Sequence, residues 1–411
     1  MNTQTIENAL WGLFISDAIS MPAHWYYKLE YLKKEFGTIR GYNNAPHPHP
    51  ESFMVGNGYF PDVEKANMYG RKYDILHQHI KFYDTSYNHL QIGMKEHAGE
   101  HANPMPMLEE RYHYHDGLKA GENTLGANLV RVLIRSIIST GAYSQETFLD
   151  DFVTFMTTPE KNNDPYTEIY IRSWFENYAK GLAPELCAEE QKSVWSIGSH
   201  GGIIRPLVLS LMSTDAYQGL GHAINHQNLT HRSENVSSSL SVLVPLLQAL
   251  IQGHDPIRTL KKYASKVPLI EIKGKALSKA YREHNGPGNI PKDEMYKIHT
   301  TYSDTHLDLE ETALLSEEEL IGSRFSTACY PEHGLPLLFS LLYRNGMDFS
   351  TSILANANAG GDNVHRGMIL GLIAGAKSTK VPHELKEGLK DYAEIKSEIE
   401  AFVQIISTSS S

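Results

Sequence analysis

The stretch NANAGGDNVHRGMILGLIAGA, residues 356–376, joins a polar loop to an apolar run that is typical of a buried helix. Its two adjacent glycines allow the backbone to take a positive φ or to pass close to a ligand. The acid, amide and imidazole that follow stand at the predicted start of the helix, where unpaired N–H groups and the helix dipole favour anions. An ordinary Asp or Asn cap on a tightly packed helix has the same pattern, so both interpretations stay open. The candidate ligand-binding residues of this stretch are Gly360, Gly361, Asp362, Asn363 and His365.

Helical periodicity dominates the rest of the chain. Between Leu125 and Ile138 the apolar residues recur every three or four positions, which places them on one face of a helix. Residues 240–251 and 334–346 are predicted helices that each contain a proline, and residues 382–406 are predicted to form a final surface helix. Alternating patterns typical of strands are scarce. The sequence therefore predicts an all-α fold.

One region departs from this pattern. Residues 36–116 hold nine of the 21 histidines, together with many tyrosines and prolines, and we expect an irregular insertion with short helices at most. A length of 411 residues would by itself suggest two or three domains. No internal repeat or low-complexity linker divides the chain, however. We therefore expect a single large domain over residues 1–411, closed by a C-terminal helix and tail over 382–411.

Composition limits the partners and the compartment. The chain has 37 Lys and Arg against 48 Asp and Glu residues, a formal charge of −11 and no basic run, which argues against nucleic acid. Two cysteines, Cys187 and Cys329, are typical of an intracellular protein rather than a disulfide scaffold. The N-terminus lacks signal-peptide features, and the longest apolar run, residues 367–376, has half of the roughly 20 residues that cross a bilayer. We expect a cytoplasmic protein that binds neither nucleic acid nor membrane.

A second candidate site lies in HYHDGLKAGENTLGANLVRVLI, residues 113–134, where Glu122 and Asn123 again precede an apolar helix. Hard cations prefer carboxylate and amide oxygens, whereas imidazole suits zinc and other transition metals. His113 and His115 would share one side of an extended segment. A capped helix after a polar loop is the simpler interpretation of the same residues.

A third candidate site lies in ISDAISMPAHWYY, residues 15–27. Asp17 stands in an apolar, helix-like segment, and a carboxylate there needs a donor or a cation if it is buried. His24 and the three aromatic residues after it can line a pocket for a ring. Such an aromatic cluster more often fills a hydrophobic core.

A fourth candidate site lies in SIGSHGGIIRP, residues 196–206. A glycine-rich turn at Gly201, followed by Arg205, can hold a phosphate group through backbone N–H groups and a guanidinium. It is neither a Walker A nor a dinucleotide motif. The polar loop around Asp164 is expected to be a plain connection between helices.

Taken in order, these segments resemble the ADP-ribosylglycohydrolase family, which includes the dinitrogenase reductase-activating glycohydrolase and the J1 crystallins. The family pattern Gly-Asp-Ala-Leu-Gly-x-Pro is similar to SDAISMP and places Asp17 on the family aspartate. The pattern Gly-Gly-Asp-Thr-Asp-Thr-x-Gly is similar to GGDNVHRG. The Thr-Asp-Asp-Thr motif falls on GENT, the glycine-rich loop on SHGGIIR and the Thr-His segment on LTHRSENV. The resemblance spans residues 9–376 and implies the orthogonal multi-helix bundle of this family.

The resemblance also implies magnesium as the cofactor. The family binds two Mg²⁺ ions through paired aspartates and threonines, but here Val364 and His365 replace one such pair and His24 replaces a glutamate. Glu122 and Asp362 are the carboxylates that remain at matching positions. Because hard dications rely on carboxylates, the resemblance implies one Mg²⁺ ion or none, with Glu122 and Asp362 as the metal ligands.

The implied activity is hydrolysis of an ADP-ribosyl or related ribosyl N- or O-glycosidic bond, in a small-molecule nucleotide or an ADP-ribosylated substrate. Such cleavage passes through an oxocarbenium-like state and needs a proton donor or metal and an activated water, with His365 or His24 as the group that transfers the proton. The implied catalytic residues are Glu122, Asp362, His365 and His24. The implied substrate-binding residues are Asp17, Asn123, His115, Gly201, Arg205, Gly360, Gly361 and Asn363.

Two other functions stay open at this stage. A non-catalytic binding or structural protein could keep the fold, as the J1 crystallins do, and the loss of a carboxylate at Val364 favours it. An enzyme of small-molecule metabolism could use the same pocket for another nucleoside or glycoside. Binding of nucleotide and metal distinguishes the structural function from the two enzymatic ones.

Overall fold

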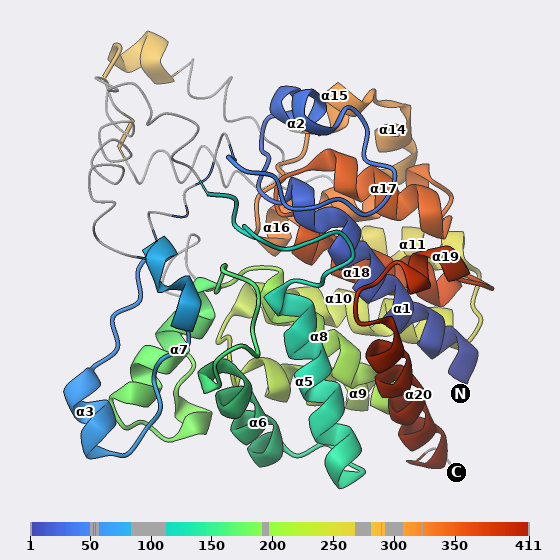
Figure 1. Cartoon of the computed structure of the whole chain (residues 1–411). Helices are drawn as coiled ribbons and strands as arrows, with labels where there is room; N and C mark the ends of the chain where they lie inside the picture. Colours follow the sequence, from blue (N-terminus) through green and yellow to red (C-terminus); the bar gives the residue numbers. More distant parts are fainter. Residues whose placement is uncertain are drawn as a thin grey trace.

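The structure is a computed structural model that describes residues 2–49, 52, 54, 57–83, 112–190, 197–267, 281–288, 290–291, 307–321 and 324–409. Over these residues the chain forms helices and no β-strand. Extended segments pair only in two isolated bridges within that part of the chain, Glu190 with Arg232 and Ile321 with Phe325. The prediction of an all-α fold is therefore confirmed, and Figure 1 shows helices crossing at many different angles.

The centre of the fold is a pair of antiparallel helices from opposite ends of the chain, α1 (Thr3–Ser20) and α18 (Asn363–Lys377). Both are buried along most of their length. Glycines let the two backbones approach closely, since a Cβ on Gly12 would lie 2.0 Å from the carbonyl oxygen of Gly371. The end of α1 therefore lies beside the start of α18, where Asp362 is the residue before the first helical turn.

The remaining helices pack around and outside this pair. The longer ones are α5 (Leu125–Thr140), α6 (Gln145–Thr157), α7 (Ile169–Ala179), α8 (Gly201–Leu209), α9 (Ala216–Gln227), α10 (Glu234–Ile251), α11 (Pro256–Ala264), α16 (Pro331–Arg344), α17 (Phe349–Ala359) and α20 (Tyr392–Ser409). The shorter ones are η1 (Met21–Ala23), α2 (Leu29–Phe36), α3 (Val63–Met68), η3 (His77–Tyr83), η6 (Pro184–Leu186), η7 (Ser210–Met212), α14 (Leu309–Leu314), α15 (Glu317–Leu320) and α19 (His383–Glu387). One cluster of buried hydrophobic side chains draws on residues from Ile6 to Ile406.

The predicted helices are present, with their ends shifted. The periodic segment from Leu125 is α5, and the two proline-bearing segments lie in α10 and α16, with Pro245 and Pro336 inside the helices. The predicted C-terminal helix is divided into α19 and α20. The break packs against the segment before α5, because the backbone N–H of Lys390 donates to the carbonyl of Gly121 at 2.9 Å.

The predicted insertion over residues 36–116 contains only short helices in its described parts, α3 and η3. Its middle, residues 84–111, lies outside the described residues. Histidine and tyrosine rings from its two ends pack over the segment after α1: the ring of His49 lies 4.2 Å from that of Tyr26 and 5.2 Å from that of His113, between centroids. Nε2 of His49 also lies 3.1 Å from the carbonyl oxygen of His24, so these rings lie against the segment that carries His24.

Among the described helices, α10 is long and apolar enough to cross a membrane by length and composition, with a mean hydropathy of 1.3. In the structure, 61% of that helix is buried against the rest of the molecule. Its composition is therefore explained by its place in the core.

Candidate active site

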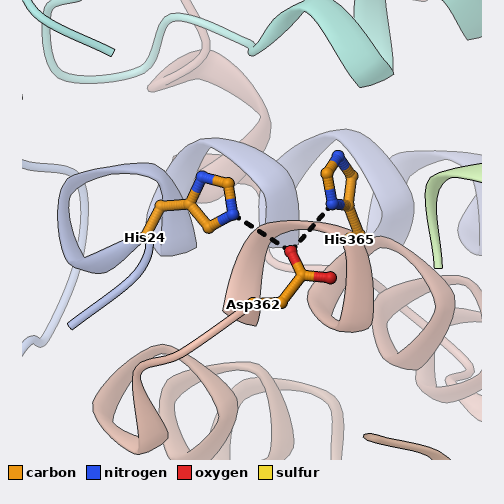
Figure 2. Close-up of side chains that lie close together, drawn as sticks. All are labelled: His24, Asp362 and His365. Carbon is orange, nitrogen blue, oxygen red and sulfur yellow. Dashed lines mark hydrogen bonds and ion pairs between the residues drawn. The ribbon is translucent and has the colours of Figure 1, made fainter. Parts of the chain in front are cut away.

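The candidate site is built around the carboxylate of Asp362 at the start of α18. Its Oδ1 lies 3.0 Å from Nε2 of His24 and 2.8 Å from Nδ1 of His365, and its Oδ2 lies 2.9 Å from Nδ1 of His200. Figure 2 shows two of these rings, His24 and His365, directing a nitrogen toward the same oxygen. All four side chains are buried. Residues more than 300 positions apart in the sequence thus meet at one carboxylate, as expected if His24, Asp362 and His365 form a site.

Backbone hydrogen bonds hold the segment after α1 against the loop before α18. The N–H of Trp25 donates to the carbonyl of Gly361 at 2.7 Å, and the N–H of Gly361 donates back to the carbonyl of Tyr26 at 2.8 Å. Gly360 and Gly361 both have φ of +63°. A Cβ on Gly361 would lie 2.2 Å from the carbonyl oxygen of Thr327. The two glycines, predicted to take a positive φ or to let the chain pass close to a ligand, have that positive φ and lie against backbone atoms of Tyr26 and Thr327.

The imidazole of His365 lies between two carboxylates. Its Nδ1 contacts Asp362 and its Nε2 lies 3.3 Å from Oε1 of Glu168, whose Oε2 accepts a hydrogen bond from Ser199 at 3.0 Å. Burial by itself would lower the pKa of His365, but the charges of Asp362 and Glu168 raise that pKa well above its ordinary value. The two carboxylates thus favour the protonated form of the ring.

The charge of the protonated His365 ring lowers the pKa values of Asp362 and Glu168. Burial by itself would raise the pKa of Asp362, but the charge of His365 and the hydrogen bonds of His200 and His24 hold that pKa well below its usual range. Burial likewise opposes ionisation of Glu168, and the charge and hydrogen bond of His365 keep its pKa below the ordinary value. Next along α18, burial lowers the pKa of Arg366 to about 10, against the attraction of Asp362. The site thus holds charged groups of both signs out of water.

A row of hydrogen-bonded side chains runs from Asp362 through His24 and His115 to Asp164. The Nδ1 of His24 lies 2.6 Å from Nε2 of His115, and Nδ1 of His115 lies 2.8 Å from Oδ1 of Asp164. Asp164 also accepts hydrogen bonds from the backbone N–H groups of Leu125 at 2.7 Å and Tyr166 at 3.1 Å. Burial lowers the pKa of His24 to about 3, so the neutral ring is favoured there. His115, predicted to bind substrate, belongs to this buried row.

Asp17 and Asn123 lie at the start of α5 rather than beside Asp362. The carboxylate of Asp17 accepts hydrogen bonds from the backbone N–H of Thr124 at 2.8 Å, its Oγ1 at 2.7 Å and Nδ2 of Asn123 at 2.8 Å. Together with Asp164 it satisfies the first N–H groups of α5, which any helix leaves unpaired. Burial raises the pKa of Asp17, although these hydrogen bonds oppose the rise. Both aspartates cap the helix from other parts of the chain.

The structure does not bring Glu122 to Asp362. Its carboxylate pairs with the ammonium of Lys390 and accepts hydrogen bonds from the backbone N–H of Lys119 at 2.6 Å and from Nδ2 of Asn163 at 3.2 Å. These residues border a cavity of about 780 Å³ beside α5 and α6. The expected pair of metal ligands, Glu122 and Asp362, is therefore not assembled, because Glu122 turns toward Lys390.

Arg205 and Gly201 also differ from their predicted roles in holding phosphate. The guanidinium of Arg205 is buried and donates to the hydroxyl of Tyr170 and to Oγ1 of Thr230, both at 2.8 Å. Gly201 faces Glu168, since a Cβ there would lie 2.5 Å from Oε1 of that residue. The loop therefore supports the Glu168 carboxylate.

Asn363 binds protein backbone in the structure. Its Nδ2 donates to the carbonyl of Ala357 at 3.1 Å, which ties the first turn of α18 to α17. Its Oδ1 is buried and has no hydrogen-bond partner among the described residues. Asn363 thus fixes the loop that carries Asp362.

Sequence reasoning missed Glu168 and His200 as members of the site. His200 stands inside the SHGG turn that was considered for phosphate binding, and Glu168 immediately precedes α7. Both are polar residues at the start of a helix, the same signal that singled out Asp362. The surrounding glycines are a further signal, because a Cβ on Gly334 would lie 2.1 Å from the ring of His200.

Aromatic side chains form the wall next to His24. Trp25 has a positive φ of 64°, which is uncommon for a residue other than glycine, and its ring centroid lies 4.2 Å from that of Tyr114 and 5.3 Å from that of Tyr166. Its buried indole N–H finds no acceptor in the part of the chain that the structure describes. A strained aromatic residue with an unused donor is a feature of ligand-binding walls.

Three side chains are placed to hold a metal ion. Ligand atoms of His24, Asp362 and His365 all lie within 4.8 Å of one another, and no other such group of three is found among the described residues. Mg²⁺ prefers six oxygen ligands and near-ideal octahedral geometry. Two imidazoles and one carboxylate do not fit that preference, so the magnesium implied by the sequence resemblance is not supported by these residues.

Comparison with known proteins identifies the fold and then the family. A solved structure described as an ADP-ribosylglycohydrolase-related protein complex is 14% identical over 98% of both chains, with a TM-score of 0.55, and this likeness shows the fold. The model of the ADP-ribosylglycohydrolase family matches residues 3–410, so the chain belongs to that family. A comparison with curated proteins found no match. Family and fold together support a hydrolase of the ADP-ribosylglycohydrolase type.

Proposed function

We propose that the protein hydrolyses an ADP-ribosyl or related ribosyl N- or O-glycosidic bond at the group formed by Asp362, His365 and Glu168. The observation that carries this proposal is the position of the His365 ring, 2.8 Å from one buried carboxylate and 3.3 Å from the other. Glycoside cleavage requires a group that protonates the leaving group and a carboxylate that stabilises the sugar cation or activates water, and His365 and Glu168 are groups of these two kinds.

The reacting face of the site is formed by His365 and Glu168. They are 5% and 7% exposed, whereas Asp362, His24 and His200 are fully buried. A glycoside that enters the site would therefore meet Nε2 of His365 and the carboxylate of Glu168 first. Asp362 holds the histidine in place and is a positioning residue.

The chemistry assigned to His365 and Glu168 follows from their charges. The imidazolium of His365 donates the proton of its Nε2 to the leaving group as the glycosidic bond breaks. The Glu168 carboxylate stabilises the positive charge that develops on the sugar and then accepts a proton from the attacking water. Ser199 donates a hydrogen bond to the other oxygen of Glu168, which fixes the orientation of the carboxylate.

The aromatic wall supports a substrate that contains a flat ring. Trp25 presents its indole next to Tyr114, on the same segment that carries His24. Stacking on an aromatic side chain can bind a nucleobase whatever hydrogen-bond donors and acceptors that base carries. A nucleotide or an ADP-ribosylated substrate would place its base there and its ribose at His365.

The test is release of ADP-ribose from two substrates, ADP-ribosyl-arginine for an N-glycoside and an ADP-ribosyl-serine peptide for an O-glycoside, followed by chromatography. We expect turnover of at least one by the wild type. His365→Gln should reduce kcat/KM by roughly 100-fold or more, since general acid catalysis contributes about 10²–10⁴-fold. No release by the wild type, together with no binding of ADP-ribose in calorimetry, would overturn the proposal in favour of a structural role.

A further inference from the structure

We propose that His24, Asp362 and His365 form a binding site for one divalent transition-metal ion of the zinc or iron type. The ring nitrogens that face Oδ1 of Asp362 lie 3.0 and 2.8 Å from it, as Figure 2 shows. Neighbouring ligands around an ion with bonds of about 2.0–2.1 Å lie about 2.8–3.4 Å apart. The carboxylate oxygen and each ring nitrogen are thus already at the spacing of ligands that share an ion.

The donor set distinguishes the class of ion. Imidazole suits zinc, iron, nickel and copper, and two histidines with one carboxylate are a common ligand set of divalent iron and zinc. Mg²⁺ and Ca²⁺ depend on oxygen ligands, which only Asp362 supplies here. The ion proposed is therefore of a different class from the magnesium that the sequence resemblance implies.

The outer nitrogens of the two rings are held as they are in metal sites. A histidine that binds metal through one nitrogen usually donates the other N–H to a carboxylate, which fixes the ring and its tautomer. Nε2 of His365 faces Glu168 directly. Nδ1 of His24 reaches Asp164 through His115. The outer nitrogen of each ring is thus linked to a buried carboxylate, directly for His365 and through His115 for His24.

A divalent ion at the three ligand atoms is compatible with the outer hydrogen bonds. His24 would bind the ion through Nε2 and donate from Nδ1 to His115, which donates in turn to Asp164. His365 would bind through Nδ1 and donate from Nε2 to Glu168.

The test is isothermal titration calorimetry of the whole chain with Zn²⁺, Co²⁺ and Mg²⁺, with metal content measured after dialysis. We expect one Zn²⁺ or Co²⁺ per chain, bound at least 100-fold more tightly than Mg²⁺. Bound Co²⁺ should also give a visible absorption band.

Variants locate the site. His24→Ala and His365→Ala should each weaken Zn²⁺ binding by at least tenfold, and Asp164→Asn should do so by about 10–100-fold through the outer hydrogen bond. His226→Ala is the matched control, since His226 is an equally buried histidine that contacts Tyr143 and Phe148 instead. Circular dichroism should confirm that each variant is folded.

Three results would overturn the proposal: no Zn²⁺ or Co²⁺ binding at millimolar concentration, tighter binding of Mg²⁺, or an equal loss in His226→Ala. The readout is binding rather than turnover, so the proposal does not rest on the proposed hydrolysis. His365 would be the acid of that reaction only in the metal-free chain, because its Nδ1 cannot carry a proton and bind the ion at the same time. A chain that binds Zn²⁺ at these residues and cleaves no glycoside would keep this site and reject the activity.

Discussion

Two helix starts in this protein look alike in sequence and differ in structure. Before α5 and before α18, acids and amides precede an apolar helix, and each helix start has a fully buried aspartate beside it, Asp17 and Asp362 respectively. Asp17 accepts hydrogen bonds from a backbone N–H, a hydroxyl and an amide. Asp362 receives three imidazole nitrogens. One carboxylate caps a helix, and the other is the centre of a cluster of titratable groups.

The pKa values of the two aspartates move in opposite directions. Burial raises the pKa of Asp17, because its neutral donors do not offset the loss of water. For Asp362 burial acts in the same sense, but the positive charge of His365 and the bonds of His200 and His24 lower the pKa. A buried acid with neutral partners is thus explained by packing, whereas one that faces a buried cation is a candidate for chemistry.

The largest expected effect on stability comes from replacing a glycine before α18, and a glycine at the end of α5 serves for comparison. Gly361→Ala places a Cβ at a φ of +63° and 2.2 Å from the backbone of Thr327, so we expect a loss of more than about 3 kcal/mol in unfolding free energy. Gly141→Ala, at the end of α5, has φ of +73° with nothing within 4 Å, and should lose about 1 kcal/mol. Urea unfolding measures both. Equal losses would show that the loop before α18 can move.

A smaller effect concerns the pH dependence of stability at Asp17. Since its folded pKa is raised above the ordinary value of 3.8, its contribution is fully present below that pH and is lost as pH rises through the folded pKa. The unfolding free energy of the wild type minus that of Asp17→Asn should therefore decrease from pH 4 upward, by at most about 1.4 kcal/mol per pH unit. Urea unfolding at pH 4, 5.5 and 7 measures this. A difference that grows with pH would mean that Asp17 faces a cation.

The smallest effect is expected for Glu122. The side chain of its partner Lys390 is more than half exposed, and pairs with an exposed partner contribute little. Glu122→Gln should change the free energy of unfolding by less than about 1 kcal/mol, measured by the same urea method. A loss as large as that of Gly361→Ala would place Glu122 among the residues that hold the fold together.

The sequence alone predicted the all-α fold and part of the candidate site. Helical periodicity predicted α5, α10 and α16, and the glycine-bearing stretch 356–376 predicted a buried helix after a polar loop. That stretch, with His24 from the segment after α1, supplied the three residues that meet in the structure. Local pattern could place these because the signal lies within one turn of a helix.

The remaining residues depend on packing between distant segments. Whether Glu122 turns toward Asp362 or toward Lys390 is decided by the break between α19 and α20, which lies more than 260 positions away. Glu168 joins the site because Gly201, from another helix, leaves room for its carboxylate. Neither arrangement leaves a mark in the local sequence. The positive φ expected as one possibility at residues 360 and 361 is found, whereas the backbone atoms of Tyr26 and Thr327 beside them could not be identified from the sequence.

The most direct test of the account applies the same change to one acid at each site. Glu168→Gln and Glu122→Gln are matched acid-to-amide substitutions, and kcat/KM for the better ADP-ribosyl substrate is the measurement. We predict a loss of roughly 100-fold or more for Glu168→Gln, because the base beside His365 is removed, and a change of less than about threefold for Glu122→Gln. A large loss for Glu122→Gln with little change for Glu168→Gln would contradict the account and move the reacting groups to the start of α5.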